Sequence, residues 1–137
     1  MAAGRATSRY IRTSAQKAGL VLDQIRGNDV ARALATLRFS RKLIARDIEK
    51  VLRSAVANVQ QQEGFGGDVD RLFVAKCYAD QGPSMKRIRP APMGRAFRVV
   101  KRMAHLTVEV AERPQKKSVA PAEGAKRPRA KKAPAAK

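Results

Sequence analysis

The stretch GPSMKRIRPAPMGRAFRVVKR, residues 82–102, contains seven Lys or Arg residues and no acidic residue. Pro90, Pro92 and Gly94 lie in its middle, where they favour a reversal of the chain. On either side the residues alternate as in β-strands, and both faces carry cations. Because an unpaired buried cation is very costly, such a hairpin cannot lie in a protein core. The stretch therefore predicts a basic β-hairpin, about residues 80–104, whose arms extend on the order of 30 Å from a globular body.

Two segments of alternating apolar and polar residues flank this hairpin. Residues 70–79 and 104–110 both alternate with a period of two, so we expect them to pair antiparallel and to carry the hairpin between them. One face of the first strand should contain Leu72, Val74, Lys76 and Tyr78. One face of the second should contain Ala104, Leu106, Val108 and Val110. Residues Thr7–Arg12 are expected to add a third strand.

Three helices are predicted between the third strand and residue 70. Thr13 and Gln16 form a capping-box pattern that opens the first helix. Gly27 ends it, Asn28 or Asp29 caps the second helix, and Ser40 caps the third, which ends at GFGG, residues 64–67. The apolar residues at helical spacing are Ala18, Val21, Leu22, Ile25, Val30, Ala33, Leu34, Leu37, Ile44, Ile48, Val51, Leu52, Ala55, Val56 and Val59. Three helices packed on a small antiparallel sheet form an α+β domain.

The charge of the chain points to a nucleic-acid partner. The 30 Lys and Arg residues exceed the 11 Asp and Glu residues by 19, and most of the excess lies outside the nearly balanced segment 13–80. A balanced body with basic extensions is typical of nucleic-acid-binding proteins. From residue 113 onward Ala, Pro, Lys and Arg predominate, which predicts a disordered tail. The expected organisation is a domain at 1–112, including the hairpin, followed by the tail at 113–137.

Few residues are candidates for catalysis or metal binding. Cys77, the only cysteine, excludes an internal disulfide and a Cys-based zinc site, and its place in a strand indicates a small buried hydrophobe. His105, the only histidine, is expected to pack or to form a hydrogen bond. Asp68 and Asp70 are expected to be turn residues. No enzyme, cofactor or metal site is therefore predicted.

No segment approaches the roughly 20 apolar residues of a membrane span. The N-terminus also lacks the apolar region of a secretory signal, so a cytosolic protein is expected.

Within the hairpin, apolar residues are interleaved with Lys and Arg, which indicates nucleic-acid contact rather than a solvated loop. Apolar side chains pack on bases or sugars while the cations neutralise phosphates. An irregular finger fits folded RNA, which is recognised largely by shape. A histone-like DNA-binding protein is the alternative, and a nuclease that uses Asp68, Asp70 or His105 is a weaker third.

Five stretches of this sequence resemble one known family. They are SAQK at 14–17, DQIRG at 23–27, KVLRSAVANV at 50–59, DQGPSMKRIRP at 80–90 and GRAFRVVKRMAHLTVEV at 94–110. Together they resemble the bacterial large-subunit ribosomal protein twenty-two family from about residue 7 to residue 112. The resemblance implies a structural constituent of the large subunit of the cytoplasmic ribosome that aids its assembly. Its implied partners are large-subunit ribosomal RNA, neighbouring ribosomal proteins and the nascent polypeptide.

The resemblance also implies which residues make these contacts. Those expected to bind ribosomal RNA are Arg9, Arg12, Ser14, Lys17, Lys86, Arg87, Arg95, Arg98, Lys101 and Arg102. Those expected at the hairpin tip, which would line the nascent-peptide exit tunnel, are Met85, Arg89, Pro90, Ala91, Pro92, Met93 and Gly94. The family often carries a basic residue at the position of Ala91 and Arg at the position of Gly19. Gly94 is expected to allow a positive φ or a close backbone approach.

Overall fold

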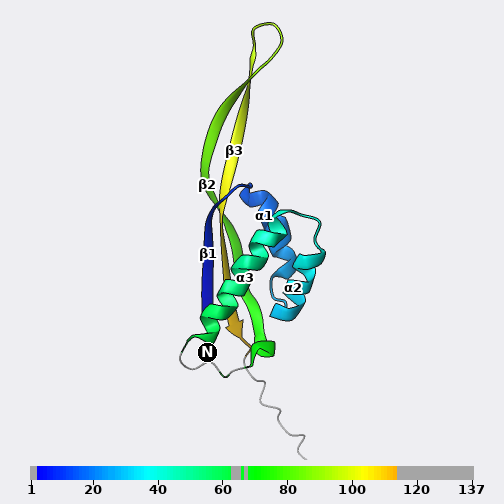
Figure 1. Cartoon of the computed structure of the whole chain (residues 1–137), viewed down its shortest axis with the longest axis vertical. Helices are drawn as coiled ribbons and strands as arrows, with labels where there is room; N and C mark the ends of the chain where they lie inside the picture. Colours follow the sequence, from blue (N-terminus) through cyan, green and yellow to red (C-terminus); the bar gives the residue numbers. More distant parts are fainter. Residues whose placement is uncertain (1–2, 63–65, 67, 114–137) are drawn as a thin grey trace, which may run out of the picture.

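In the computed structural model, which describes residues 3–62, 66 and 68–113, helices cover one face of an antiparallel sheet of three strands (Figure 1). The elements are β1 (Ala3–Ile11), α1 (Ala15–Ile25), α2 (Val30–Phe39), α3 (Ile44–Gln60), a 3₁₀ turn (Val69–Arg71), β2 (Leu72–Pro90) and β3 (Ala96–Glu112). β3 is the central strand, with β1 and β2 on its two sides. The predicted α+β class is confirmed. The predicted third strand is also present, but it begins at Ala3. Apart from Arg113, the predicted tail lies outside the described residues.

The core lies between the helices and the sheet, and the predicted helical stripes form most of it. On α3, the residues Ile48, Leu52, Ala55 and Val59 are all fully buried. The other helices contribute Ala18, Val21, Leu22, Ile25, Val30, Ala33 and Leu37. The sheet contributes Leu72, Val74, Cys77, Leu106, Val108 and Val110. Burial of this apolar surface is the main stabilising term of the body.

The starts of the first two helices differ in detail from the prediction. Ser14, not Thr13, caps α1, and its Oγ accepts a hydrogen bond from the backbone N–H of Lys17 at 3.4 Å. Asp29 is the N-cap residue of α2, as predicted, but its side chain makes no capping hydrogen bond. Its carboxylate instead pairs with Arg113 at 2.9 Å and so ties the end of β3 to the loop before α2.

The predicted start of α3 is wrong by several residues. Ser40 ends α2, and α3 begins only at Ile44. Between them the backbone makes a tighter turn, in which the carbonyl of Lys42 accepts from the N–H of Ala45 at 2.9 Å. Such i to i+3 bonds are common at helix ends. The helix ends at Gln60, before the GFGG segment, most of which lies outside the described residues.

A β-bulge in β2 overturns the predicted alternation of that strand. The register with β3 shifts between Val74 and Lys76, so Ala75 is an extra residue. Cys77 therefore points into the core and is 2% exposed, whereas Lys76 lies on the outer face. Because a bulge moves all later side chains to the other face, simple periodicity fails beyond Val74.

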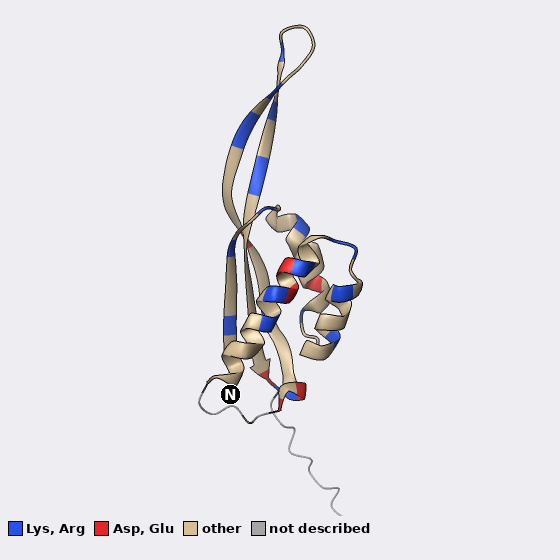
Figure 2. Cartoon of the chain, in the orientation of Figure 1, with Lys and Arg blue, Asp and Glu red and all other residues tan. Residues whose placement is uncertain are grey.

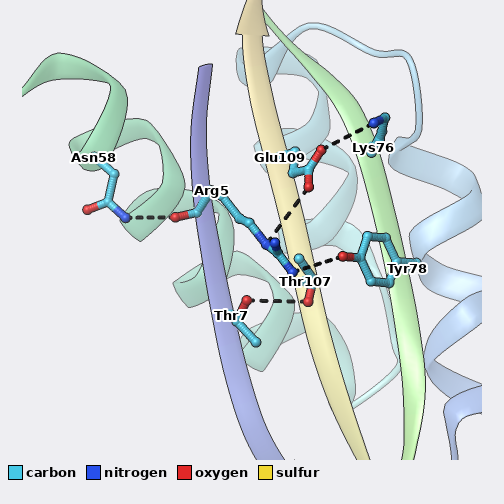
Figure 3. A network of polar contacts seen from close by, with 7 residues as sticks. All are labelled: Arg5, Thr7, Asn58, Lys76, Tyr78, Thr107 and Glu109. Carbon is cyan, nitrogen blue, oxygen red and sulfur yellow. Dashed lines mark hydrogen bonds and ion pairs between the residues drawn. The ribbon is translucent and has the colours of Figure 1, made fainter. Parts of the chain in front are cut away.

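The face of the sheet opposite the helices carries a polar network (Figure 3). The guanidinium of Arg5 donates to the hydroxyl of Tyr78 at 3.0 Å and lies 3.8 Å from a carboxylate oxygen of Glu109. The ammonium of Lys76 lies 3.8 Å from the other carboxylate oxygen. From the helix-covered side of the sheet, Asn58 of α3 donates to the backbone oxygen of Arg5 at 2.9 Å. The network spans the three strands, and Glu109 offsets the charge of two body cations.

The environment of Cys77 gives a simple test of the fold. Its thiol donates to the backbone carbonyl of Leu22 at 3.3 Å, and burial raises the pKa of the Cys77 thiol above its ordinary value. We expect iodoacetamide at pH 8 to alkylate Cys77 at least about 100-fold more slowly in the folded protein than in guanidinium, because the reactive thiolate is disfavoured and inaccessible. Mass spectrometry of quenched samples measures both rates, and equal rates would contradict the burial.

Candidate nucleic-acid interface

β2 and β3 continue past the body as the predicted hairpin, here called the finger (residues 82–103). Figure 2 shows cations along both of its arms and no acidic residue between them. No residue from 81 to 103 is buried. The last strand pair is Pro90 with Ala96, so residues 91–95 form the turn. The finger therefore presents its whole length to a partner.

The turn is held by its own backbone. The N–H of Ala91 donates to the carbonyl of Arg95 at 3.0 Å, and the N–H of Arg95 donates to the carbonyl of Pro92 at 3.4 Å. Met93 and Gly94 have φ values of +59° and +69°. The predicted positive φ of Gly94 is confirmed, and the space around it is open. The turn exposes Met93, whose side chain is 92% accessible.

Along the arms, five of the six cations face an apolar residue across the strand pair, and the sixth, Arg102, faces Ser84. The successive pairs are Met85–Lys101, Lys86–Val100, Arg87–Val99, Ile88–Arg98 and Arg89–Phe97. Like charges directly opposite each other would destabilise the hairpin, whereas an apolar neighbour can pack on the alkyl stem of Lys or Arg. The finger thus carries a high charge without opposing two cations in one pair.

The same register distributes the cations over both faces of the finger. Residues directly opposite in an antiparallel pair share a face, and successive pairs alternate between faces. One face therefore carries Lys86, Arg98 and Arg102, and the other carries Arg87, Arg89 and Lys101. A polyanion could contact either face, so this arrangement suits a partner that surrounds the finger.

A second bulge marks the root of the finger, where it leaves the body. The register shifts between Gln81 and Ser84, so Gly82 and Pro83 oppose a single residue of β3, Met103. A Cβ on Gly82 would lie 3.1 Å from the backbone oxygen of Met103, which explains the glycine. Bulges bend a strand and increase its twist. The Gly-Pro pair within a strand indicates such a bend, whereas the alternation of apolar and polar residues does not reveal it.

His105 fixes the connection between β1 and α1 beside this root. Its Nδ1 accepts a hydrogen bond from the backbone N–H of Tyr10 at 3.0 Å, and the two rings meet edge-on at 4.9 Å. Tyr10 has a φ of +60°, within an irregularity of β1 between Ser8 and Ile11. The predicted packing and hydrogen-bonding role of His105 is thereby confirmed.

This connection brings predicted RNA-binding residues of the body against the finger. Arg12, Ser14 and Lys17 line one wall of an open cleft, and Lys101 and Arg102 line the other. We call this the root cleft. Four cations from separate parts of the chain converge there beside the N-terminus of α1, where backbone N–H groups and the helix dipole also favour an anion.

The predicted site residues do not all lie together. Arg9 is exposed on β1, within the irregular stretch that precedes the root cleft. Met85 pairs with Lys101 next to the root, so the structure places it away from the turn that holds the other predicted tip residues. Arg89 and Pro90 form the last two pairs before the turn, as expected of tip residues.

The cations of the body and of the interface differ in their ion pairs. Among the described residues, the cations in ion pairs are Arg5, Arg26, Arg38, Arg53, Arg71, Lys76 and Arg113, all outside the finger and root cleft. Within the same ranges, no ion pair involves a cation of the finger or of the root cleft. Their charge is therefore available to an external anion.

Other kinds of site find no support in the described ranges. They contain no group of three or more His, Cys, Asp or Glu side chains that could hold a metal ion. Asp68 begins the 3₁₀ turn and pairs with Arg71 at 3.0 Å, in keeping with its predicted turn role. None of the helices described here is long and apolar enough to span a membrane.

Two comparisons with known proteins cover most of the described chain. The family model described as ribosomal protein L22p/L17e matches residues 6–111, which include the body, the finger and the root cleft. A large ribosomal subunit protein uL22 of Solibacter usitatus (strain Ellin6076) is 52% identical over 109 residues, covering 80% of this chain and 96% of the relative.

Proposed function

This chain belongs to the ribosomal protein L22p/L17e family, and from this premise we propose that its finger and root cleft bind large-subunit ribosomal RNA. The protein is a structural, non-enzymatic constituent of the large subunit of the cytoplasmic ribosome. Family membership favours this role over the histone-like alternative. We further propose how the chain contacts the RNA, that it aids subunit assembly, and that the finger reaches the nascent-peptide exit tunnel.

The absence of ion pairs along the finger carries the proposal. Six cations of its arms lie three on each face, and none of them has an acidic partner among the described residues. RNA that encloses the finger would bring phosphates to both faces at once. The apolar residues opposite most of these cations, such as Ile88 and Phe97, would pack on sugars or bases.

The root cleft would act as a clamp at the base of the finger. Arg12 and Lys17 would bind the same RNA segment as Lys101 and Arg102 across the cleft, so the segment would join body and finger. Ser14 caps α1, and the N-terminus of this helix would lie beside the bound phosphate. Arg9, Lys86, Arg87, Arg95 and Arg98 complete the proposed set of RNA contacts.

A role in subunit assembly follows from the exposure of the finger. A hairpin without a core of its own gains much of its stability from the RNA that packs around it. The RNA in turn is held by a charged rod that neutralises several phosphates at once. Protein binding and RNA folding are therefore thermodynamically coupled.

At its outer end, the finger would line the nascent-peptide exit tunnel. This step rests on family membership, and the exposed turn is compatible with it. The proposed tip residues are Arg89, Pro90, Ala91, Pro92, Met93 and Gly94. The two backbone hydrogen bonds of the turn and its prolines would keep the loop rigid, as a wall element requires.

The salt dependence of binding tests the charge-based part of the proposal. We expect the affinity of the full chain for large-subunit ribosomal RNA to fall with a log–log slope of about −6 or steeper, because the finger cations alone would displace about seven counterions. Filter binding over a salt series measures the slope. A slope shallower than about −2, or equal affinity for duplex DNA of the same length, would contradict the proposal.

Sedimentation of cell lysate tests the same proposal in the assembled particle. The protein should remain in the large-subunit peak of a sucrose gradient after a high-salt wash. Release by the wash, with recovery in DNA-bound fractions, would restore the histone-like alternative.

A further inference from the structure

The connection between α2 and α3 forms a second basic surface that the proposed function leaves unused. Figure 1 shows it on the side of the body away from β1, at residues 38–46, here called the α2–α3 corner. A cleft there is lined by Arg38, Arg41, Lys42, Leu43, Arg46 and Glu49, among others. Between residues 38 and 46 the sequence contains four cations and no acid.

Most of the charge at this corner is not neutralised by the protein. Glu49 is the acid that lines the cleft. It already pairs with Arg38 at 3.6 Å and with Arg53 at 2.6 Å. Arg41, Lys42 and Arg46 are exposed, and within the part of the chain that the structure describes they have no ion pair. Three cations are therefore available here, as they are on each face of the finger.

Two large apolar side chains stand exposed among these cations. Phe39, the last residue of α2, is 89% accessible, and Leu43 is 80% accessible. Leaving them in water forgoes the stabilisation that burial of a large apolar side chain provides. Their placement repeats the pattern of the finger, in which an exposed Phe or Ile lies beside Arg and Lys.

The backbone of the corner is ordered by its own hydrogen bonds. The N–H of Ser40 donates to the carbonyl of Leu37 at 3.3 Å, and the hydroxyl of Ser40 accepts from the N–H of Lys42 at 3.4 Å. The tight turn before α3 adds a further backbone hydrogen bond, in which the N–H of Arg46 donates to the carbonyl of Leu43 at 3.3 Å. The aromatic ring and the cations are thus carried on a fixed backbone, which lowers the entropic cost of binding.

We propose that the α2–α3 corner is a second RNA-binding site, at which an unpaired base stacks on Phe39. Arg41, Lys42 and Arg46 bind the phosphates on either side of that base, and Leu43 packs on a sugar. An aromatic face among cations is the combination that single-stranded RNA uses, since paired bases in a duplex are not free to stack. The inference rests on the proposed function, because it takes the partner of the body to be the RNA that binds the finger.

Photocrosslinking of large subunits that contain the protein tests this contact directly. Short-wavelength ultraviolet irradiation followed by nuclease and protease digestion should give a nucleotide adduct on a peptide that contains Phe39. Phe97 on the finger is the internal control, since it is the exposed aromatic of the main interface. Adducts at Phe97 but none at Phe39 would contradict the RNA contact at the α2–α3 corner. That result would leave the proposed function of the finger unaffected. Absence of both would count against the proposed function itself.

Matched variants test the energetics with the full chain and complete large-subunit ribosomal RNA. Arg41→Gln with Lys42→Gln should reduce the steepness of the log–log salt slope by about 1.5, because two phosphate contacts are lost. Arg32→Gln with Lys50→Gln is the control: it removes the same charge from exposed positions of α2 and α3 that have no exposed aromatic neighbour in sequence. Equal slopes for the two double variants would overturn the proposed phosphate contacts.

Phe39→Ala should weaken binding by about 5- to 100-fold, the range for loss of one stacked base. Leu20→Ala, at an apolar position of α1 that is 62% accessible, should leave binding unchanged. Phe39→Tyr keeps a stacking face and should restore most of the affinity. If Phe39→Ala binds as tightly as the unaltered chain, or if Lys42 crosslinks chemically to an acidic segment of another protein instead, an RNA contact at the corner is wrong.

Discussion

Replacing Arg98 and Lys101 together by Glu is expected to lower the affinity for large-subunit ribosomal RNA by on the order of 100-fold or more and to prevent incorporation into large subunits. Arg98 pairs with Ile88 on one face of the finger, and Lys101 pairs with Met85 on the other. Each change removes one phosphate contact and places an anion against the RNA backbone. Affinity is measured by filter binding, and incorporation by probing sucrose-gradient fractions.

The single variants then decide whether RNA contacts both faces. If the finger is enclosed, Arg98→Glu and Lys101→Glu should each weaken binding, and their effects should be of similar size. If RNA contacts one face alone, one single variant should account for nearly the whole loss.

Two controls separate charge position from net charge. Arg32→Glu with Lys50→Glu makes the same net change on the helices and should leave incorporation nearly intact. Arg98→Lys with Lys101→Arg keeps both cations and should support incorporation. Circular dichroism should be unchanged in all variants, because the finger lies beyond the core. Normal incorporation of the Arg98→Glu, Lys101→Glu protein would falsify the proposed clamp.

Much of this architecture could be predicted from the sequence because the relevant signals were local. The finger was visible as an acid-free run with Pro90, Pro92 and Gly94 at its centre. The buried stripe of α3 was visible because Ile48, Leu52 and similar residues recur at helical spacing. Such patterns report which surface is apolar, and burial follows from that directly.

The two bulges of β2 could not be found by periodicity, because each changes the face of every later residue. Beyond Ala75 the predicted face is inverted, which brings Cys77 into the core and leaves Lys76 outside. Gly82 and Pro83 offered a composition signal for the second bulge. Nothing comparable marked Ala75, whose role depends on how β2 pairs with β3.

The predicted start of α3 failed for a related reason. Ser40 is a good capping residue by type, but the chain needs a tight turn before Ile44 and Ala45 can reach the core. That turn separates Ser40 from α3, and both Phe39 before Ser40 and Leu43 after it are exposed. A helix that began at Ser40 would include residues 41–43, so the prediction did not indicate the exposed turn that forms the α2–α3 corner.

Gly4→Ala is expected to destabilise the protein by about 1–3 kcal/mol, although it adds a single methyl group. Gly4 lies on β1 directly against α3. A Cβ there would be 2.6 Å from the backbone oxygen of Ala55 and 2.8 Å from the backbone nitrogen of Val59. Because both atoms belong to a helix backbone, relief requires β1 and α3 to separate. Thermal unfolding should show a midpoint lower by roughly 5–15 °C.

Gly19→Ala is the matched control, and its effect should have the opposite sign. Gly19 lies inside α1, and no atom beyond its own helix turn lies within 4 Å of a Cβ built there. Alanine should therefore stabilise the protein by up to about 1 kcal/mol through helix propensity. If both variants shifted the midpoint in the same direction, the close contact of β1 with α3 would be wrong.

The Gly4→Ala variant also tests the RNA interface, because β1 leads directly into the root cleft. At a temperature where Gly4→Ala is fully folded, any loss of RNA affinity would measure how far the position of β1 sets the position of Arg12.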